Sequence, residues 1–387
     1  MGILIGMDEA GYGPNLGPLV VAATAWEVAE EESGVGSRES GRGERASARG
    51  VELASAARPN LAVIGRPTGR KSIRGKMPRL SSVDLYDALQ AVVVRDACAD
   101  GQIAIADSKL LYKPGHGLAQ LERGVHAFLA ALGRPAERWS TLVDVLAADP
   151  DQKQHVQPWH DGFDCRLPID TTADEQSQLG GRLGEVCGRC GVRPIAVRAR
   201  IVFPAEFNDL TAYFGTKGAA LSHVTIGLLR EVIEHVSGGC SPPAEAGSPV
   251  ALRSASRLNE PIHVVCDKHG GRNRYLALLQ HHFPDQWIDT LVESRAESRY
   301  HWGRSDTAVE VAFCAGGEAF LPAALAPMTA KYLRELAMRA FNAFWCARVP
   351  GLRPTAGYPL DARRFKAEIE AAQRALAIDD HRLWRNR

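Results

Sequence analysis

Two apolar segments near the N-terminus have the pattern of buried strands. Residues 3–7 and 19–26 are apolar on both faces, as expected of strands in the middle of a covered sheet. The residues between them are rich in glycine and proline, so we expect the two strands to form a hairpin. The first strand delivers two adjacent carboxylates, Asp8 and Glu9, directly into that turn.

Three later segments also have strand patterns. Residues 103–107 form a short apolar run, and residues 261–267 form another that ends at Asp267. Residues 195–201 alternate apolar side chains with arginines, a period of two that predicts a strand.

Apolar residues recur at spacings of three and four in the segments that we expect to be helical. The clearest stripe consists of Leu118, Leu121, Val125, Phe128 and Leu132. A second helix is expected over 219–236 and a third over 322–348. Helices interspersed with strands in this way are typical of an α/β protein.

We interpret the chain as one domain, residues 1–387, that carries two insertions. Residues 29–58 are rich in Glu, Ser, Gly, Ala and Arg without periodicity, a composition that favours disorder. Residues 238–259 are rich in Ser, Pro and Ala, and we interpret them as a second, flexible insertion. Residues 133–191 show no pattern from which chemistry can be predicted.

The overall charge does not indicate a partner. The chain has 46 Lys and Arg against 45 Asp and Glu, a formal net charge of +1, so a site for a polyanion must be a local patch. Residues 65–79 carry basic side chains and no acidic one, which makes them the best candidate. Their glycines, Gly65 and Gly69, are four apart and Arg70 follows, which does not fit a phosphate-binding loop.

No apolar run is long enough to span a bilayer, and the N-terminus lacks the pattern of a secretion signal. We therefore expect a cytoplasmic protein with no membrane partner. Eight cysteines at irregular spacings are typical of core residues in a reducing compartment. Cys187 and Cys190 have CxxC spacing, but without a second such pair we interpret them as structural and not as a zinc site.

Four acidic residues stand out by their positions. Asp8 and Glu9 follow the first strand, Asp267 ends a later strand, and Glu335 lies in the last long helix. Carboxylates at strand ends of an open α/β sheet point into the crevice where ligands bind. Grouped together they would repel one another without cations, and their hard oxygen atoms favour Mg²⁺ or Mn²⁺. A pair of such ions can align the attacking water and the leaving oxygen of a phosphodiester.

Six short motifs occur in an order that resembles a known family. The first is DEAGYGPNLGPLVVAA (8–23), followed by ADSKLL (106–111), FPAEFNDL (203–210), VVCD (264–267), AKYLRE (330–335) and GYPLDARRF (357–365). This order resembles that of ribonuclease HII, in which a DEAG turn precedes a Gly-Pro pair and a run of small apolar residues. The resemblance runs almost from end to end, interrupted by the two insertions and by residues 133–191.

The resemblance implies a ribonuclease H-like fold, with a central mixed sheet of about five strands flanked by helices. It implies metal-dependent hydrolysis of the RNA strand of an RNA–DNA hybrid, with 5′-phosphate and 3′-hydroxyl products. The partner would be such a hybrid, or duplex DNA that contains ribonucleotides, and we expect a monomer. Asp8 would be the ligand shared by two Mg²⁺ or Mn²⁺ ions, with Glu9, Asp267 and Glu335 completing the set.

The resemblance also implies substrate contacts. Gly11 and Gly13 would let backbone amides approach a 2′-hydroxyl, the group that distinguishes RNA from DNA. Lys109 would lie near the substrate backbone, and Tyr358 would either stack on a sugar or be a partly buried tyrosine. Tyr12 stands where the family usually has an arginine that helps to recognise a junction between RNA and DNA. Tyrosine cannot supply that charged group, so strict junction specificity is not expected.

Simpler structural roles are open for several of these residues. Glu335 stands where aspartate is usual, and an acid on a helix can simply pair with Lys331 or Arg339. Asp107 can cap the helix that follows it, and Lys109 can be a solvated surface lysine. The alternative function is a catalytically weak or inactive protein that keeps the fold and binds nucleic acid.

Overall fold

The computed structural model describes the chain in separate segments. They comprise residues 2–29, 83–96, 101–113, 115–147, 157–238, 260–304 and 307–386. All of them belong to one unit, which joins residues 1–29 to residues 79–387. The predicted insertions at 29–58 and 238–259 lie outside the described residues except for Ala29 and Gly238, and so does the basic stretch at 65–79.

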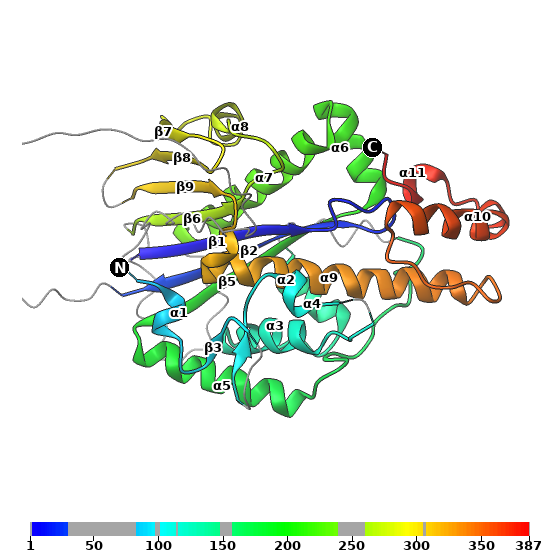
Figure 1. Cartoon of the computed structure of the whole chain (residues 1–387), viewed down its shortest axis with the longest axis horizontal. Coiled ribbons are helices and arrows are strands. Elements are labelled where there is room, and N and C mark those ends of the chain that lie inside the picture. The colour runs from blue at the N-terminus through cyan, green and yellow to red at the C-terminus, as the bar shows by residue number, and fades with distance from the viewer. Residues whose placement is uncertain are drawn as a thin grey trace, which may run out of the picture. The chain divides into compact units, whose positions relative to one another are not determined.

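A mixed sheet of seven strands forms the centre of this unit (Figure 1). Its strands are, in spatial order, β5 (Val192–Val202), β2 (Leu19–Val28), β1 (Gly2–Ala10), β6 (Ile262–Asp267), β9 (Val309–Cys314), β8 (Glu297–Trp302) and β7 (Asp289–Glu293). The predicted hairpin is confirmed, because β1 and β2 pair antiparallel from Gly2 opposite Val28 to Ala10 opposite Val20. Strand β6 is parallel to both β1 and β9, and the other neighbours are antiparallel.

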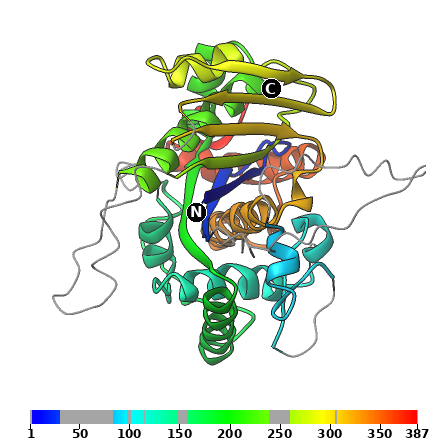
Figure 2. The same ribbon diagram turned by 90° about the vertical axis from the view of Figure 1, so that its left-hand side faces the viewer.

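The sheet contains seven strands, where the sequence predicted about five. Strands β9, β8 and β7 were not predicted; they follow β6 at one side of the sheet, as Figure 2 shows. Strand β7 is exposed along its whole length, so it lacks the apolar run of a covered strand. The predicted strand at 103–107 forms only β4 (Ile103–Ala104), which pairs with β3 (Val93–Val94) in a separate sheet of two strands.

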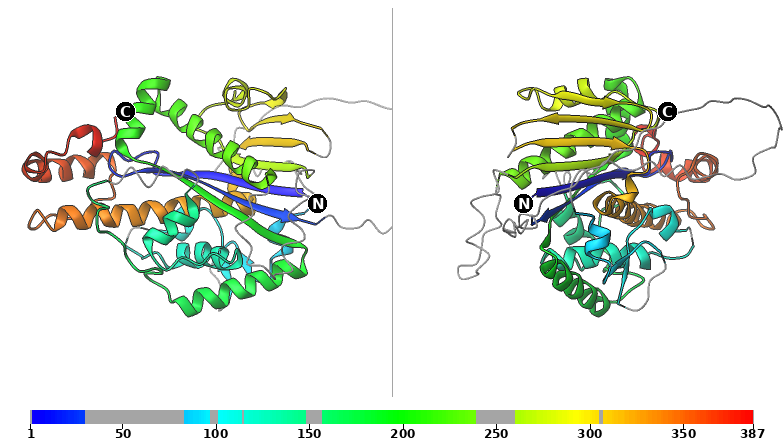
Figure 3. Two further views of the ribbon diagram at one scale, coloured as in Figure 1. Left: turned by 180° about the vertical axis from the view of Figure 1, so that it is seen from behind. Right: turned by 60° about the vertical axis from the view of Figure 1, so that its left-hand side comes forward.

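Helices cover both faces of the sheet, which makes the chain an α/β protein (Figure 3). The described helices are, in chain order, α1 (Leu85–Ala88), α2 (Ser108–Leu111), α3 (Ala119–Ala131), α4 (Trp139–Leu146), α5 (Ala173–Arg189), α6 (Pro204–Phe214), α7 (Lys217–Ser237), α8 (Leu276–His282), α9 (Leu321–Cys346), α10 (Pro359–Ala375) and α11 (Asp380–Leu383). One hydrophobic cluster joins a face of the sheet to α3, α5 and α9, and a second joins the other face to α7 and α8. Among the described residues, none of the helices combines the length and the apolar composition needed to cross a membrane.

The three predicted helices are present as α3, α7 and α9. The predicted stripe of α3 faces the core, because Leu121, Val125 and Phe128 are all buried. Helix α7 ends at Gly238, as its sequence indicated. The interval 133–191, which carried no readable pattern, contains α4 and α5, and α5 packs against α3.

Helix α9 lies directly on β1 because a glycine leaves no side chain between the two elements. A Cβ atom at Gly6 would lie 2.0 Å from the backbone nitrogen of Ala323. Thr24 on the neighbouring strand ties the start of the helix to the sheet, since its hydroxyl donates to the carbonyl of Pro322 (2.8 Å). Close approach of another backbone is a common reason for glycine within a strand.

A buried polar network joins α3 to α9. The carboxylate of Glu122, which has no exposed surface, accepts a hydrogen bond from the hydroxyl of Tyr332 (3.1 Å). It also accepts from the backbone N–H groups of Ile169 (2.6 Å) and Asp170 (2.9 Å). Nε2 of His126 lies 3.0 Å from the Tyr332 hydroxyl. Because that hydroxyl gives its hydrogen to Glu122, Nε2 of His126 must be the donor, and burial lowers the pKa of His126 to about 4, which keeps the ring neutral.

Replacing Tyr332 by Phe removes the hydroxyl between Glu122 and His126 and keeps the ring. We expect the free energy of unfolding to fall by about 1–3 kcal/mol, because buried polar groups lose their partner. Urea unfolding followed by circular dichroism measures the change. The control is Tyr213→Phe, since Tyr213 is 81% exposed; an equal loss in the two variants would contradict the role of the network.

Candidate functional site

Asp8 and Asp267 are neighbours at the ends of two parallel strands. Strands β1 and β6 pair in register up to Met7 and Cys266, so Asp8 and Asp267 are the next residues on each strand. Side chains in register on adjacent strands project from the same face of a sheet. Glu9 follows, and its backbone N–H donates to Oδ1 of Asp8 (2.7 Å). Three of the four acids singled out in the sequence thus lie near one another.

The pKa values of these carboxyl groups show how strongly their charges interact. Burial raises the pKa of Asp8 well above its usual range, and the negative charges of Glu9 and Asp267 raise it further. Burial also raises the pKa of Glu9, against a hydrogen bond with Asp8, and the charge of Asp267 adds to the rise. The pKa of Asp267 is raised first by burial and then by the charge of Glu318. The three acids therefore form a desolvated cluster of negative charge, which we call the acidic cluster.

Lys109 brings a positive charge to the acidic cluster. Its charge lowers the pKa of Glu9, and its side chain is exposed in the first turn of α2. Asp107 begins that helix, and its Oδ1 accepts a hydrogen bond from the backbone N–H of Lys109 (2.9 Å). The alternative role of Asp107 as a helix cap is confirmed. The charge of Lys109 thus acts on Glu9 in the acidic cluster. Its contact with a substrate stays a prediction.

Glu335 is engaged by a different set of partners. Its Oε1 lies 2.7 Å from Nζ of Lys331, and its Oε2 accepts a hydrogen bond from the hydroxyl of Tyr112 (2.9 Å). Arg334, the residue before Glu335 on α9, lies against Gly11. Three residues of extended chain, about 10 Å, separate Gly11 from Asp8. The ion pair with Lys331 that the sequence left open is present, and a role of Glu335 in binding metal stays a prediction.

The acidic cluster is more widely spread than the ligand set of one ion. Within the described part of the chain, His223, His281 and His282 are the group of three whose ligand atoms all lie within 4.8 Å of one another. The three acids do not form such a group.

The turn after β1 requires glycine at its first position. Gly11 has a φ of 86°, and a Cβ atom there would lie 2.5 Å from Nε of Arg334 and 2.6 Å from the carbonyl oxygen of Pro18. The carbonyl of Gly11 accepts a hydrogen bond from the guanidinium of Arg385 (2.6 Å), and that of Pro14 accepts another. Both arginines are 1% exposed, so two buried guanidinium groups contact the turn.

Tyr358 is brought to this turn by the loop between α9 and α10. The carbonyl oxygen of Gly357 accepts a hydrogen bond from the backbone N–H of Asn15 (2.8 Å). The ring of Tyr358 lies 3.9 Å from the position of a Cβ atom on Gly13 and is 52% exposed. The structure therefore brings the predicted substrate residues of the turn and Tyr358 together, although the chain separates them widely.

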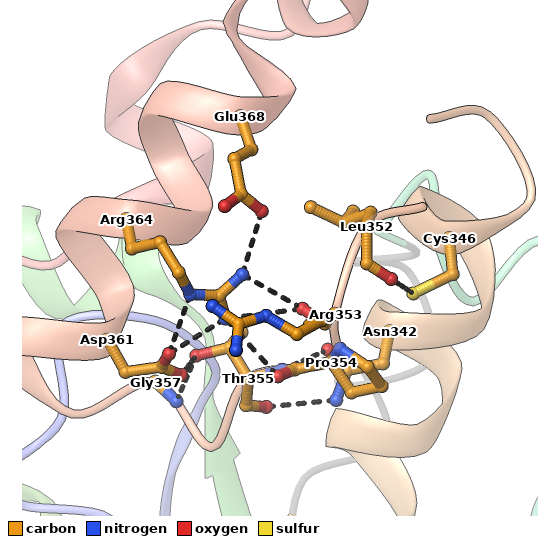
Figure 4. Close-up of polar contacts among 10 residues, drawn as sticks. All are labelled: Asn342, Cys346, Leu352, Arg353, Pro354, Thr355, Gly357, Asp361, Arg364 and Glu368. Carbon is orange, nitrogen blue, oxygen red and sulfur yellow. Dashed lines mark hydrogen bonds and ion pairs between the residues drawn. The ribbon is translucent and has the colours of Figure 1, made fainter. Parts of the chain in front are cut away.

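The shape of that loop depends on Thr355, as Figure 4 shows. Its backbone N–H donates to Oδ1 of Asn342 (2.9 Å), and its hydroxyl donates to the carboxylate of Asp361 (2.5 Å). Arg364 holds the same carboxylate from the other side, with its Nη2 2.7 Å from Oδ1. These contacts fix the loop between the end of α9 and the start of α10.

Tyr12 borders an open pocket of ≈ 590 Å³. Nζ of Lys217 lies 4.4 Å from the centre of its ring, a distance at which a cation is attracted to the ring face. The rest of the pocket wall is formed by Gly218 and by the loop His269–Arg274. This loop follows Asp267 directly and was not singled out in the sequence.

Lys268 holds the pocket loop in place. Its Nζ donates to Oδ1 of Asn273 (3.0 Å) within the loop and to the carbonyl oxygen of Ser294 (2.6 Å) beside it. The buried ring of His269 adds a contact with the hydroxyl of Ser222 on α7 (3.0 Å). The loop therefore presents Arg272 to the pocket on a supported backbone.

Glu318 is an acidic candidate that sequence analysis missed. It is exposed just after β9, and its charge raises the pKa of Asp267. A detectable signal was present, because residues 311–315 are an apolar run and an acid follows three residues after it. The strand-end argument that selected Asp267 applies equally to this position.

The CxxC pair lies at the end of α5. Burial raises the pKa of Cys187 to about 12, and its structural role stays a prediction. The thiol of Cys190 donates to the carbonyl oxygen of Ala88 (3.1 Å).

Comparisons with known proteins add no identity to this site. No family model matches the sequence. A search of curated proteins likewise returns no match.

Asp8→Asn tests whether the acidic cluster costs folded-state stability. The folded-state pKa of Asp8 is raised, so its stabilising contribution is present at low pH and is lost as pH rises through that pKa. In chelator-treated buffer at pH 7, we expect Asp8→Asn to raise the free energy of unfolding by about 1–3 kcal/mol. The gain should shrink as pH is lowered toward 4, because protonated Asp8 is neutral as well. Urea titrations at several pH values measure it.

The matched control is Asp161→Asn, because Asp161 is exposed. This control should show no gain at any pH. A wild-type protein whose stability relative to Asp8→Asn is the same at pH 7 and pH 4 would contradict the clustering of charge.

Proposed function

We propose that this protein is a divalent-metal-dependent endoribonuclease that hydrolyses the RNA strand of RNA–DNA hybrids. The observation that carries the proposal is the acidic cluster at adjacent strand ends, in which the charges of Glu9 and Asp267 raise the pKa of Asp8 and the charge of Asp267 raises the pKa of Glu9. The resemblance of the ordered motifs to ribonuclease HII supports the choice of this reaction from among those that use clustered carboxylates.

The topology supports a ribonuclease H-like interpretation of the α/β fold. Strands β5, β2, β1, β6 and β9 are contiguous within the sheet, and they form a mixed set of five that is covered by helices on both faces. This is the arrangement that the resemblance implies. Strands β8 and β7 would then be an extension beyond one edge.

The donor set of the acidic cluster fits a hard divalent cation. Its carboxylate oxygens are the ligands that Mg²⁺ and Mn²⁺ prefer, and carboxylates whose mutual repulsion raises their pKa gain most from a nearby positive charge. Asp8, Glu9 and Asp267 would hold the ions, and Glu335 would join them after leaving Lys331. The chemistry that such ions supply when bound is activation of water and stabilisation of charge on a phosphoryl group.

The surroundings of the acidic cluster supply groups suited to a ribose and a phosphate chain. Gly11 and Gly13 lack side chains that would keep backbone amides from a 2′-hydroxyl. The exposed ring of Tyr358 offers a stacking face next to Gly13, and base or sugar stacking on aromatic rings is common in nucleic-acid sites. Lys109 would contact a phosphate, which positions the strand without reading its sequence.

A second candidate function is nucleic-acid binding without cleavage. The ion pair between Glu335 and Lys331 favours binding without cleavage, because the carboxylate of the fourth predicted metal ligand is already paired with a lysine. Tyr12 also favours the binding function, since it stands where the family usually has an arginine. Cleavage and binding assays on the same preparation separate the two candidates.

The decisive test is cleavage of a labelled RNA–DNA hybrid and of a duplex that contains one ribonucleotide, with Mg²⁺ or Mn²⁺. We expect cutting of the hybrid to 5′-phosphate products, and a loss of at least about 10³-fold in Asp8→Asn, because catalytic ligands act as a unit. Asp161→Asn should retain full activity. If neither substrate is cut with either metal while the hybrid is still bound, the binding function stands and the enzyme proposal fails.

Lys331→Ala tests whether Glu335 is a metal ligand. Removing the lysine breaks the ion pair at Oε1 of Glu335 and leaves the hydrogen bond from Tyr112 to Oε2 and the weaker contact with Arg334. We therefore expect half-maximal cleavage at a Mg²⁺ concentration lower by about 2- to 10-fold, since a lost ion pair of this kind amounts to about 1 kcal/mol. Lys366→Ala, which breaks the pair with Asp380 on another helix, is the control. An unchanged Mg²⁺ dependence, together with full activity of Glu335→Gln, would show that Glu335 only pairs with Lys331.

A further inference from the structure

Three histidines from two helices meet outside the acidic cluster. His223 lies in α7, and His281 and His282 form the end of α8. Each offers one ring nitrogen, and these three atoms all lie within 4.8 Å of one another. We call this group the histidine triad. It shares no residue with the proposed nuclease site, so it calls for its own explanation.

Packing holds two of the three rings in place. The ring of His223 stacks on Phe214 with a centroid distance of 3.6 Å and an interplanar angle of 10°. Nδ1 of His223 lies 3.1 Å from Nε2 of His282, and the ring of His282 lies against Gly227, one turn further along α7. His281 is exposed, so its ring is free to adjust. Two nitrogens of packed rings and one nitrogen of an exposed ring therefore lie within 4.8 Å of one another.

The protonation state of the triad suits metal binding. Burial lowers the pKa of His282 to about 4, and burial together with the charge of His281 lowers the pKa of His223. The rings of His223 and His282 are thus neutral at neutral pH, and neutral imidazole is the form that ligates metals. The charges of Arg230 and Arg272 contribute to these shifts. They also repel a cation, so binding here would rest on bonds to nitrogen and not on long-range attraction.

We propose that His223, His281 and His282 bind one divalent transition-metal ion of the Zn²⁺ type. A set made only of imidazole nitrogens favours Zn²⁺ and its neighbours over Mg²⁺ and Mn²⁺, which prefer oxygen. Ligands about 2.1 Å from a tetrahedral Zn²⁺ are about 3.4 Å apart, and the pair at 3.1 Å is already close to that separation. Rotation of the exposed His281 brings in the third ligand, and a solvent molecule completes the coordination, as in open zinc sites.

Such an ion would fasten α8 to α7. The two helices are far apart in sequence and pack against each other. A metal bound only by the folded state stabilises it by mass action. The competing explanation is a hydrogen-bonded histidine pair without metal, in which one ring N–H joins His223 to His282 and His281 is a bystander.

Calorimetric titration of the untagged, chelator-treated full-length chain with Zn²⁺, in excess Mg²⁺, distinguishes the two explanations. Mg²⁺ occupies oxygen sites and leaves nitrogen sites free. We expect one Zn²⁺ per chain, a rise in Tm on binding, and a Co²⁺ derivative with the visible absorption of a nitrogen-ligated ion. His281→Ala should weaken binding by at least about tenfold, while leaving the contact between His223 and His282 and hence the fold of the metal-free protein intact.

Two variants serve as controls. His116→Ala removes an exposed histidine elsewhere in the chain and should leave the Zn²⁺ affinity unchanged. Asp8→Asn should also leave it unchanged, because the triad does not involve the acidic cluster. Absence of Zn²⁺ binding, an affinity that His281→Ala does not alter, or binding lost in Asp8→Asn instead would overturn the proposal.

Discussion

The close contact between α9 and β1 is the constraint on which the rest of the described structure depends. A helix can lie this near a strand only where the strand has no side chains, and Gly6 provides that space at Ala323. Further along, Arg334 lies against Gly11 and Met338 against Gly17. The helix thus follows the strand and then the turn beyond it. A side chain at Gly6 would meet the backbone of the helix and lift it, whereas Gly11 and Gly17 have positive φ values that favour glycine.

This contact also explains how distant residues come to surround one place. Strand β1 ends at the acidic cluster, and the turn after it rests on Arg334 from α9 and on Arg385 from the C-terminal end of the chain. The loop after α9 returns to the same turn through the hydrogen bond from Asn15 to Gly357. Segments from both ends of the chain therefore set the position of Tyr358 relative to Gly13.

Electrostatics sets the two proposed cation sites apart within one fold. The acidic cluster holds like charges in a desolvated place, which opposes folding and is typical of sites shaped for function. In the histidine triad the pKa values of His223 and His282 are lowered, so these two rings carry no such charge, and nitrogen donors suit a different class of metal. The packing of the two hydrophobic clusters stabilises the fold and offsets the unfavourable free energy of the clustered charges.

Local patterns in the sequence were sufficient to predict the β1–β2 hairpin, the strands β5 and β6, and the helices α3, α7 and α9, because these elements are long and their apolar faces are regular. They also selected Asp8, Glu9 and Asp267, since an acid at the end of a buried strand is a local signal. The exposed strand β7 has no such signal, and the strand at 103–107 could not be assigned to a sheet because pairing depends on distant partners.

Tertiary structure alone decided which of the selected residues interact. It gave Glu335 the hydrogen-bond partner Tyr112, it added Glu318 to the surroundings of Asp267, and it joined His223 to two histidines that lie far along the chain. Residue spacing determines which face of an element a side chain occupies, whereas the packing of elements against one another determines what that face meets.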